Sequence, residues 1–148
     1  MSLEVTRALE ALVVAACEKA HPDEACGLLI GVPPAAFDAP DRAVVVDEVR
    51  PLANGWDSSA KTNRYLIDPR ELARVEDELA ASGRGVVGFF HSHPDAPAWP
   101  SPFDLMMAWP CVSYWILRVD AGKVSDSRSW QRSEDGRSFA EEAIHLEG

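Results

Sequence analysis

A run of apolar residues at 86–90 ends abruptly in two histidines, His91 and His93. An apolar run of this length is typical of a strand that is buried on both faces. Residues i and i+2 of a strand project from the same face, so the two imidazoles would lie side by side. The chain must therefore fold around a central strand that carries two polar rings at its end. Such a pair of rings needs polar groups or an ion to interact with.

Helices and strands are predicted to alternate along the chain. Apolar residues at three- and four-residue spacing predict a helix over residues 2–20, and Asp68 before Pro69 predicts a second helix that Gly83 ends. Strands are predicted at residues 26–32, 43–52, 64–67, 86–93, 111–119 and 124–132, followed by a C-terminal strand or short helix. Interleaved elements predict a mixed α/β fold around one sheet. The length of 148 residues fits a single domain over residues 1–148.

The net charge of the chain limits the classes of molecule that it can bind. It holds 24 acidic and 14 basic side chains, for a formal net charge of −10. Such a surface is repelled by phosphate backbones and anionic bilayers, so we expect neither nucleic acid nor a membrane as partner. Lysines are rare among the basic residues, which fits either a GC-rich genome or salt adaptation. Three cysteines without a CxxC pair form no disulfide framework, so we expect Cys17 and Cys111 to be buried thiols in a reducing, cytoplasmic compartment.

A carboxylate follows the two histidines at a distance that suits a metal site. A proline-bracketed loop and the first turn of a short helix separate His93 from Asp104, and they would return this carboxylate to the strand end. Two imidazoles and one carboxylate suit zinc, and three protein ligands leave a fourth position open for water, as in catalytic sites. Zinc lowers the pKa of such a water to about 7. The ordinary alternatives are incidental histidines, a first-turn carboxylate at Asp104 and a helix N-cap at Ser101.

A hydrolytic site also needs a group that moves protons, and Glu24 is the candidate. It precedes the apolar segment 26–32, where it would reach the end of the sheet. A glutamate beside an activated water can accept its proton and pass that proton to a leaving amine. The alternative for Glu24 is a solvated turn residue. The remaining histidines, His21 and His145, lie in no comparable setting.

These residues occur in a recognisable order. HSHP at residues 91–94, PS at 100–101 and Asp104 together resemble the HxHPx₅PSxxD signature of the JAMM metallopeptidases, also called MPN-plus or Mov34/PAD-1 proteins. The segment 22–31, which contains Glu24, is similar to the stretch that bears the catalytic glutamate of that family. The resemblance extends over roughly residues 9–119, and no position of the signature is substituted.

The resemblance implies a role for each residue of the signature. His91, His93 and Asp104 would hold one zinc ion per chain, with water as the fourth ligand. Glu24 would act first as general base and then as general acid, and Ser101 would donate its hydroxyl to the oxyanion. The implied fold is a curved, barrel-like mixed sheet flanked by helices, similar to that of cytidine deaminases.

The resemblance also implies a substrate class. Members of this family cleave peptide or isopeptide bonds after the Gly-Gly tail of ubiquitin-like proteins. Short bacterial-type members resemble processors of small sulfur carriers in cysteine, thiamine or related metabolism, so the expected partner is a ubiquitin-like sulfur carrier with a Gly-Gly tail. Trp99 and Trp109 flank the predicted metal loop. We expect both to pack in the core or loop, and the alternative is that they line the groove for the tail.

Two other functions remain open from the sequence. One is a non-catalytic MPN-type scaffold that binds partners, although such members typically lose metal ligands and this chain retains them all. The other is a zinc hydrolase that uses the same site on a small-molecule amide. The sequence specifies neither the identity of the carrier nor the oligomeric state.

Overall fold

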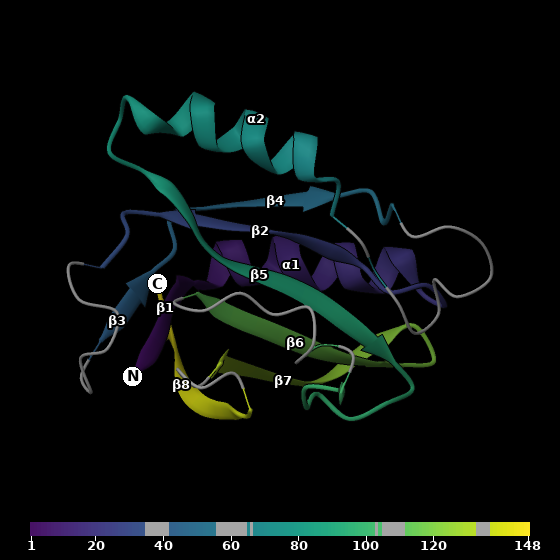
Figure 1. Cartoon of the computed structure of the whole chain (residues 1–148). Helices are drawn as coiled ribbons and strands as arrows, with labels where there is room; N and C mark the ends of the chain where they lie inside the picture. The colour runs from purple at the N-terminus through teal and green to yellow at the C-terminus, as the bar shows by residue number, and fades with distance from the viewer. Residues whose placement is uncertain (35–41, 56–64, 66, 103, 105–111, 133–136) are drawn as a thin grey trace.

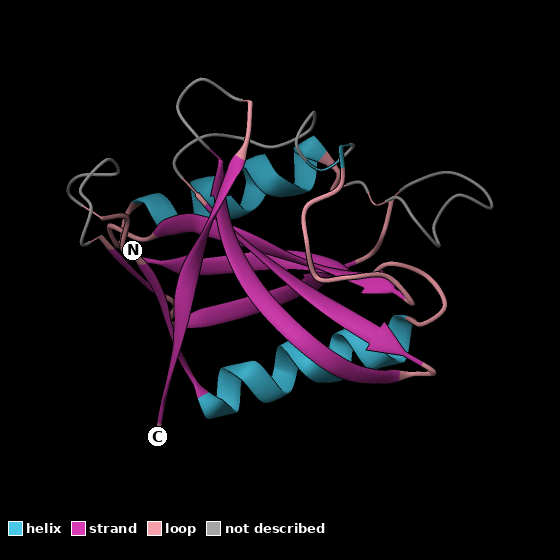
Figure 2. Ribbon diagram, turned by 90° about the horizontal axis from the view of Figure 1, so that it is seen from below, coloured by secondary structure: helices cyan, strands magenta, loops and turns pink. Residues whose placement is uncertain are grey.

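The strands of this chain pair into one mixed sheet that is flanked by helices on both faces (Figures 1 and 2). The computed structural model describes residues 1–34, 42–55, 65, 67–102, 104, 112–132 and 137–148. Its elements, in chain order, are β1 Ser2–Thr6, α1 Arg7–Ala20, β2 Cys26–Gly31, β3 Ala43–Val45, β4 Glu48–Leu52, α2 Pro69–Ala80, β5 Gly85–Pro94, β6 Ser113–Asp120, β7 Lys123–Arg132 and β8 Phe139–Glu147. The predicted mixed α/β class is confirmed.

The sheet curls until its two edges are bridged by a short link. The strand order is β3-β1-β8-β7-β6-β5-β2-β4, so that β3 and β4 occupy opposite edges. They are joined by only two residues: Val46 donates its N–H to the carbonyl of Glu4 beside β3, and Asp47 donates to the carbonyl of Ile30 beside β4. Two residues can span both edges only if the sheet is strongly curved. This confirms the predicted barrel-like curvature.

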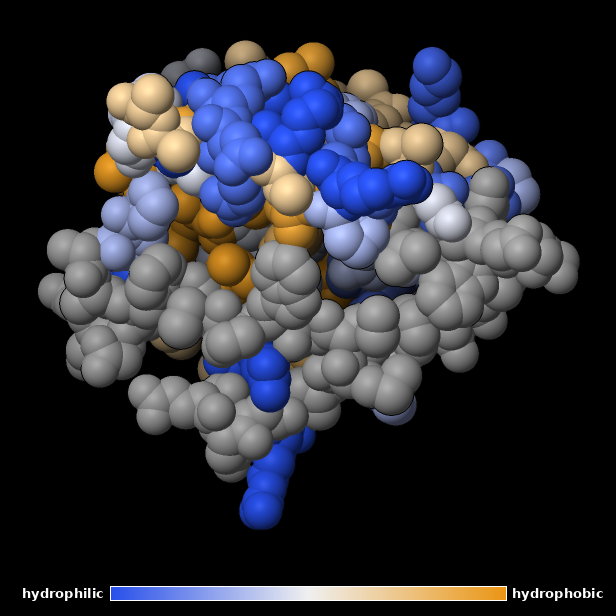
Figure 3. Space-filling view, turned by 45° about the horizontal axis from the view of Figure 1, so that its top comes forward, coloured by the Kyte–Doolittle hydropathy of each residue, from blue (hydrophilic) through white to orange (hydrophobic). Residues whose placement is uncertain are grey.

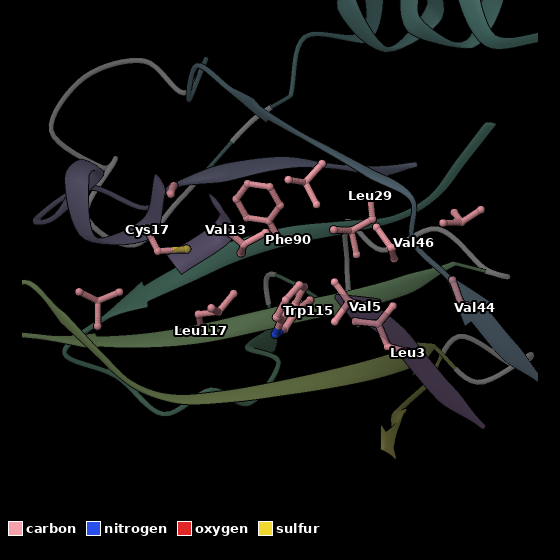
Figure 4. Close-up of a cluster of buried hydrophobic side chains, with 14 residues drawn as sticks. Leu3, Val5, Val13, Cys17, Leu29, Val44, Val46, Phe90, Trp115 and Leu117 are labelled. Carbon is pink, nitrogen blue, oxygen red and sulfur yellow. The ribbon is translucent and has the colours of Figure 1, made fainter. Parts of the chain in front are cut away.

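One face of the sheet forms a hydrophobic cluster with α1. Val13 and Cys17 of this helix contact strand residues that include Phe90 of β5 and Leu117 of β6, and all four are fully buried or nearly so (Figure 4). We call this set the first cluster: Leu3, Val5, Val13, Cys17, Ala25, Leu29, Val44, Val46, Val49, Val87, Phe90, Trp115, Leu117 and Val119. The expectation that Cys17 is a small buried residue is confirmed.

The opposite face is covered by α2 and forms a second cluster. Its members are Leu28, Ile30, Leu72, Val75, Leu79, Phe89 and Tyr114. The helix begins as predicted, because the Asp68 side chain accepts a hydrogen bond from the N–H of Arg70 and Pro69 occupies the first turn. The outward side of this helix carries mainly charged residues, and hydrophilic atoms accordingly dominate the upper part of the face shown in Figure 3.

The N-terminal prediction is wrong in its first five residues. Instead of opening the helix, Ser2–Thr6 form strand β1, which pairs in parallel with both β3 and β8. Leu3 and Val5 point into the first cluster while their neighbours do not, and this two-residue alternation is the pattern of a strand. Thr6 then accepts a hydrogen bond from the N–H of Leu9 and caps α1.

Two further strand predictions need correction. Residues 43–52 form the separate strands β3 and β4 rather than one, because the link at Val46 and Asp47 moves the chain from one sheet edge to the other. In the predicted strand 64–67, the described residues Tyr65 and Ile67 are not in a strand. Trp109, Cys111 and residues 64 and 66 lie outside the described residues.

The remaining strands lie close to their predicted positions, and the C-terminal segment is the strand β8. Cys17 and Cys26 are free thiols and both are buried. Within the described part of the chain, no helix is both long and apolar enough to cross a membrane.

Candidate metal centre

A β-bulge in β5 determines which face of the sheet carries the histidines. The pairing of β5 with β2 shifts between Leu29 and Ile30, so that Val87 is the extra residue on β5. Beyond the bulge, Phe89 points into the second cluster and Phe90 into the first. The alternation then continues to the strand end. His91 and His93 therefore share the face of Phe89, as the sequence predicted.

Both histidines are buried, with exposed fractions of 0% for His91 and 8% for His93. Their strand lies inside the sheet, because β5 pairs with β6 along both histidines and with β2 as far as His91. Their ring centroids lie 5.0 Å apart. Their burial excludes surface histidines and leaves the alternative of histidines that only fill the core to be judged by their contacts.

Asp104 reaches the histidines through the segment that joins two parallel strands. Because β5 and β6 run parallel, the chain after His93 must cross back over the sheet before β6 begins. Ser101 and Asp104 lie on this crossing and cap each other. The N–H of Ser101 donates to Asp104 Oδ2 over 2.8 Å, and the N–H of Asp104 donates to Ser101 Oγ over 3.0 Å. This reciprocal pair is a capping box, and it fixes the carboxylate of Asp104.

Three ligand atoms converge on one point. The Nε2 atoms of His91 and His93 are 3.2 Å apart, and Asp104 Oδ2 lies 3.0 Å from the Nε2 of His93 and 3.3 Å from that of His91. Tetrahedral zinc sites with bonds of about 2.0 Å separate their ligand atoms by about 3.3 Å. Two imidazole nitrogens that face each other across one carboxylate oxygen suit a cation between them. The donor set and its spacing therefore fit a metal ion.

Glu24 belongs to the same cluster. It is 3% exposed, and ligand atoms of Glu24, His91 and His93 all lie within 4.8 Å of one another. The alternative of a solvated turn residue is therefore wrong. Its backbone is held from both sides, because Asn54 Nδ2 donates to the Glu24 carbonyl over 3.1 Å and the next residue, Ala25, is bound by Ser92.

Ser92 ties the strand between the two histidines to the segment that carries Glu24. Its side chain lies on the opposite face of β5, where it is fully buried. The N–H of Ala25 donates to Ser92 Oγ over 2.8 Å, and the N–H of Ser92 donates to the Ala25 carbonyl over 3.1 Å. The Oγ of Ser92 thus adds a hydrogen bond where the pairing of β2 with β5 ends. We find no signal in the sequence alone that singles Ser92 out for this contact.

The electrostatics of the cluster favour an ionised aspartate. Burial opposes the charge of Asp104, but the two adjacent histidines outweigh it and hold the pKa of this carboxyl far below its usual range. Burial lowers the pKa of His91, so that its imidazole tends to be neutral, as a metal ligand must be. His93 is also desolvated, yet its hydrogen bond to Asp104 and the charge of that group raise its pKa overall.

Two aromatic residues near the cluster differ from the sequence-based expectations. Tyr65 stacks on the ring of His91, with centroids 4.5 Å apart and an angle of 22° between the planes, a contact that local sequence patterns did not reveal. Desolvation and then the charge of Asp104 raise the pKa of Tyr65 well above its usual value. Trp99 is 59% exposed, so the expectation that it packs in the core or loop is wrong.

Comparison with known proteins identifies the family. The sequence profile of the family described as prokaryotic homologs of the JAB domain matches residues 6–133. This chain belongs to that JAB family. The predicted resemblance to the JAMM and MPN proteins is thereby confirmed.

Two curated relatives of this JAB protein are named as a desampylase and as a peptidase. It is 30% identical over 127 residues to the desampylase of Haloferax volcanii, a match that covers 85% of this chain and 80% of the relative. It is 30% identical over 105 residues to the CysO-cysteine peptidase of Mycobacterium tuberculosis, which covers 71% of this chain and 64% of that enzyme. The second match therefore spans less than two thirds of the relative.

Solved structures agree on the JAB fold. A solution structure of a protein from Desulfitobacterium hafniense superposes with a TM-score of 0.78 at 32% identity, covering 98% of this chain and 92% of that one. A JAB1/MPN domain protein from Archaeoglobus fulgidus gives a TM-score of 0.59 at 20% identity, covering 99% and 98% of the two chains. At that lower identity the likeness concerns the fold alone.

Proposed function

We propose that this JAB protein is a zinc-dependent peptidase that hydrolyses the bond after the C-terminal Gly-Gly of a small ubiquitin-like sulfur carrier. One observation carries the proposal: the ligand atoms of His91, His93 and Asp104 converge within 3.3 Å of one another beside the buried Glu24. In this proposal the three residues hold one zinc ion per chain. When bound, the ion would act as a Lewis acid and activate water for attack on the scissile carbonyl.

The protein groups would then handle protons and charge. Glu24 accepts a proton from the attacking water and returns it to the departing amine, which its place in the cluster supports. Ser101 Oγ already accepts a hydrogen bond from the N–H of Asp104, and a hydroxyl that accepts one bond still has its own proton to donate. Ser101 can therefore cap the helix turn and stabilise an oxyanion at the same time.

The names of the relatives support the substrate class. A desampylase and a CysO-cysteine peptidase both match this chain at 30% identity. The second name denotes cleavage of a cysteine from CysO, and we propose a carrier of the same kind, extended beyond its Gly-Gly tail, as substrate. Whether the group removed is a single amino acid or a conjugated protein determines the pathway in which the enzyme acts.

The surroundings of the cluster offer two contacts for such a tail. Strand β4 forms an edge of the sheet, and Asn54, two residues beyond its end, bonds the backbone of Glu24. An extended peptide can add to a sheet edge through main-chain hydrogen bonds, and glycines need only a narrow groove. Trp99 is exposed on the loop between His93 and Asp104, where it would contact the carrier.

The decisive experiment is cleavage of a defined carrier. Purified protein with measured zinc content is incubated with a ubiquitin-like protein that ends in Gly-Gly-X, and the product is read by intact mass. We expect loss of X from the wild type, and no loss from Glu24→Gln with zinc still bound. Failure to trim any Gly-Gly-X tail, while a small amide is hydrolysed, would favour the small-molecule alternative. A folded wild type that binds no metal would favour the scaffold.

Three further features belong to the same proposal. We propose that residues 1–148 act as one JAB domain, which the continuous sheet from β1 to β8 supports. The buried free thiols of Cys17 and Cys26 support a reducing compartment such as the cytoplasm. The net charge of −10 supports a protein partner rather than nucleic acid.

A further inference from the structure

The two histidines of the cluster are held in different ways. His93 Nδ1 lies 2.7 Å from the carbonyl of Pro97, so this nitrogen carries the proton and Nε2 is left for the cluster. Such a hydrogen bond on the far side of the ring is the usual way in which proteins orient a metal-binding histidine. His91 lacks it: its buried Nδ1 has no hydrogen-bond partner among the described residues.

An aromatic ring packs on the face of the His91 imidazole. Tyr65 stacks nearly parallel on His91, with ring centroids 4.5 Å apart and planes inclined by 22°. A parallel contact restricts rotation of the imidazole about its Cβ–Cγ bond, because turning the ring would break the face-to-face packing. The described ring contacts of these histidines are the one between His91 and His93, both on β5, and the one between His91 and Tyr65. Tyr65 is therefore the partner that comes from outside this strand.

The backbone near Tyr65 is well anchored. Ile67 packs against the second cluster, and Asp68 caps α2 by accepting a hydrogen bond from the N–H of Arg70. The tyrosine is therefore three residues from Asp68, the fixed N-cap of α2. A ring placed in this way can impose an orientation on its neighbour rather than adapt to it.

We infer that Tyr65 is a positioning residue whose ring fixes the plane of His91 and so aims its Nε2 at the metal. The inference rests on the proposed metal centre, and it concerns affinity for the ion rather than the proton transfers. The ring face of Tyr65 provides the effect and its hydroxyl is dispensable. Replacement of the ring by an aliphatic side chain should therefore weaken metal binding, whereas removal of the hydroxyl should not.

The test is a competition titration of zinc against a chromophoric chelator, performed on the metal-stripped full chain. Tyr65→Phe should bind zinc within about threefold of the wild type. Tyr65→Leu, and Tyr65→Met as a second non-aromatic replacement, should bind it about 10- to 100-fold more weakly, as losses around metal ligands typically do. The matched control is Tyr114→Leu, which removes a tyrosine that stacks on Phe89 instead of a histidine. It should lower the melting temperature and leave zinc affinity unchanged.

Each outcome separates this inference from the proposed function. Wild-type protein that fails to bind zinc defeats the metal centre itself. Tight zinc binding by Tyr65→Leu and Tyr65→Met, or equal weakening by Tyr114→Leu, defeats only the role of Tyr65. Should the aliphatic variants not fold, NMR of the His91 ring decides: stacking moves its ring protons upfield in the wild type and in Tyr65→Phe, and normal shifts in both would overturn the inference.

Discussion

Asp104 and Glu142 are both buried carboxylates, 7% and 4% exposed, but their surroundings differ in kind. Glu142 receives one neutral donor on each oxygen: Ser129 Oγ at 2.7 Å and Gln131 Nε2 at 2.8 Å. Asp104 presents a single oxygen, Oδ2, to two imidazole nitrogens that also face each other. Glu142 thus has a hydrogen-bond partner within the protein on each oxygen. The group around Asp104 would be completed by a cation in the metal centre that we propose.

The surroundings of a buried carboxylate thus distinguish a structural group from a ligand site. A buried polar group is stabilised when each of its atoms has a hydrogen-bond partner, and a carboxylate with two neutral donors meets that condition. Lone pairs that converge from several residues indicate a ligand site instead. The distinction predicts which substitutions affect the metal and which affect only folding.

The largest effect is expected at Asp104. Asp104→Ala, like His91→Ala, leaves two ligands, which hold zinc poorly. We expect the zinc content measured by inductively coupled plasma mass spectrometry to fall from one per chain toward zero. Turnover should fall by at least about 10³-fold because the Lewis acid is lost. Glu142→Gln is the matched control on the other buried carboxylate, and it should retain one zinc. Loss of zinc from both variants would contradict the distinction between Asp104 as a metal ligand and Glu142 as a hydrogen-bonded carboxylate.

Ser101 should matter for turnover but not for the ion. Ser101→Gly removes the hydroxyl, while glycine at a helix N-cap costs only a few tenths of a kcal/mol. We expect turnover about 10²-fold lower with full zinc content, as for other lost oxyanion donors. Ser101→Thr, which keeps a hydroxyl, should retain most of the activity. Unchanged turnover in Ser101→Gly would reduce this residue to a cap that holds Asp104.

The sequence predicted the three proposed ligands of this site better than it predicted the residues that hold them in place. Strand alternation and a capping box are local patterns, so the spacing of His91, His93 and Asp104 was enough to bring them together. The bulge at Val87 decides which face they use, and it depends on pairing with β2. Tyr65 contacts His91 from far away in the chain, and no periodicity encodes such a contact.

The same limit explains the errors in the fold. Residues 43–52 were predicted as one strand, but β3 pairs with β1 and β4 pairs with β2 at the opposite edge, and such an edge is defined only by distant partners. At the N-terminus, Leu3 and Val5 fit a helical spacing as well as a two-residue alternation. Their partners in β8 lie about 140 residues away along the chain and decide in favour of the strand.

Trp99 offers a moderate test of where the carrier binds. Trp99→Ala removes a ring that is 59% exposed on the loop between His93 and Asp104, so metal content and stability should remain unchanged. We expect KM for a Gly-Gly-X carrier to rise about tenfold, as when an aromatic contact at an interface is lost, with little change in kcat. Val45→Ala removes another exposed apolar side chain, on the edge strand β3, and should leave KM unaltered.

Glu142 should affect stability alone. In Glu142→Gln one of the two donors, Ser129 or Gln131, meets an amide group in place of a carboxylate oxygen, so a buried hydrogen bond is weakened or lost. The free energy of unfolding in urea should fall by about 1–3 kcal/mol. Turnover and zinc content per folded molecule should stay at the wild-type level. A change in turnover without a change in stability would mean that this cluster communicates with the metal centre.

The smallest effect is expected at Cys17, which lies in the first cluster. Burial raises the pKa of its thiol to about 12, so at pH 8 only about one molecule in ten thousand carries the reactive thiolate. We expect iodoacetamide to leave the Cys17 peptide unmodified in native protein and to label it fully in urea, as measured by peptide mass mapping. Metal removal should not change this result, because α1 packs on the face of the sheet opposite to His91. Rapid labelling after chelation would instead show that the ion also stabilises the first cluster.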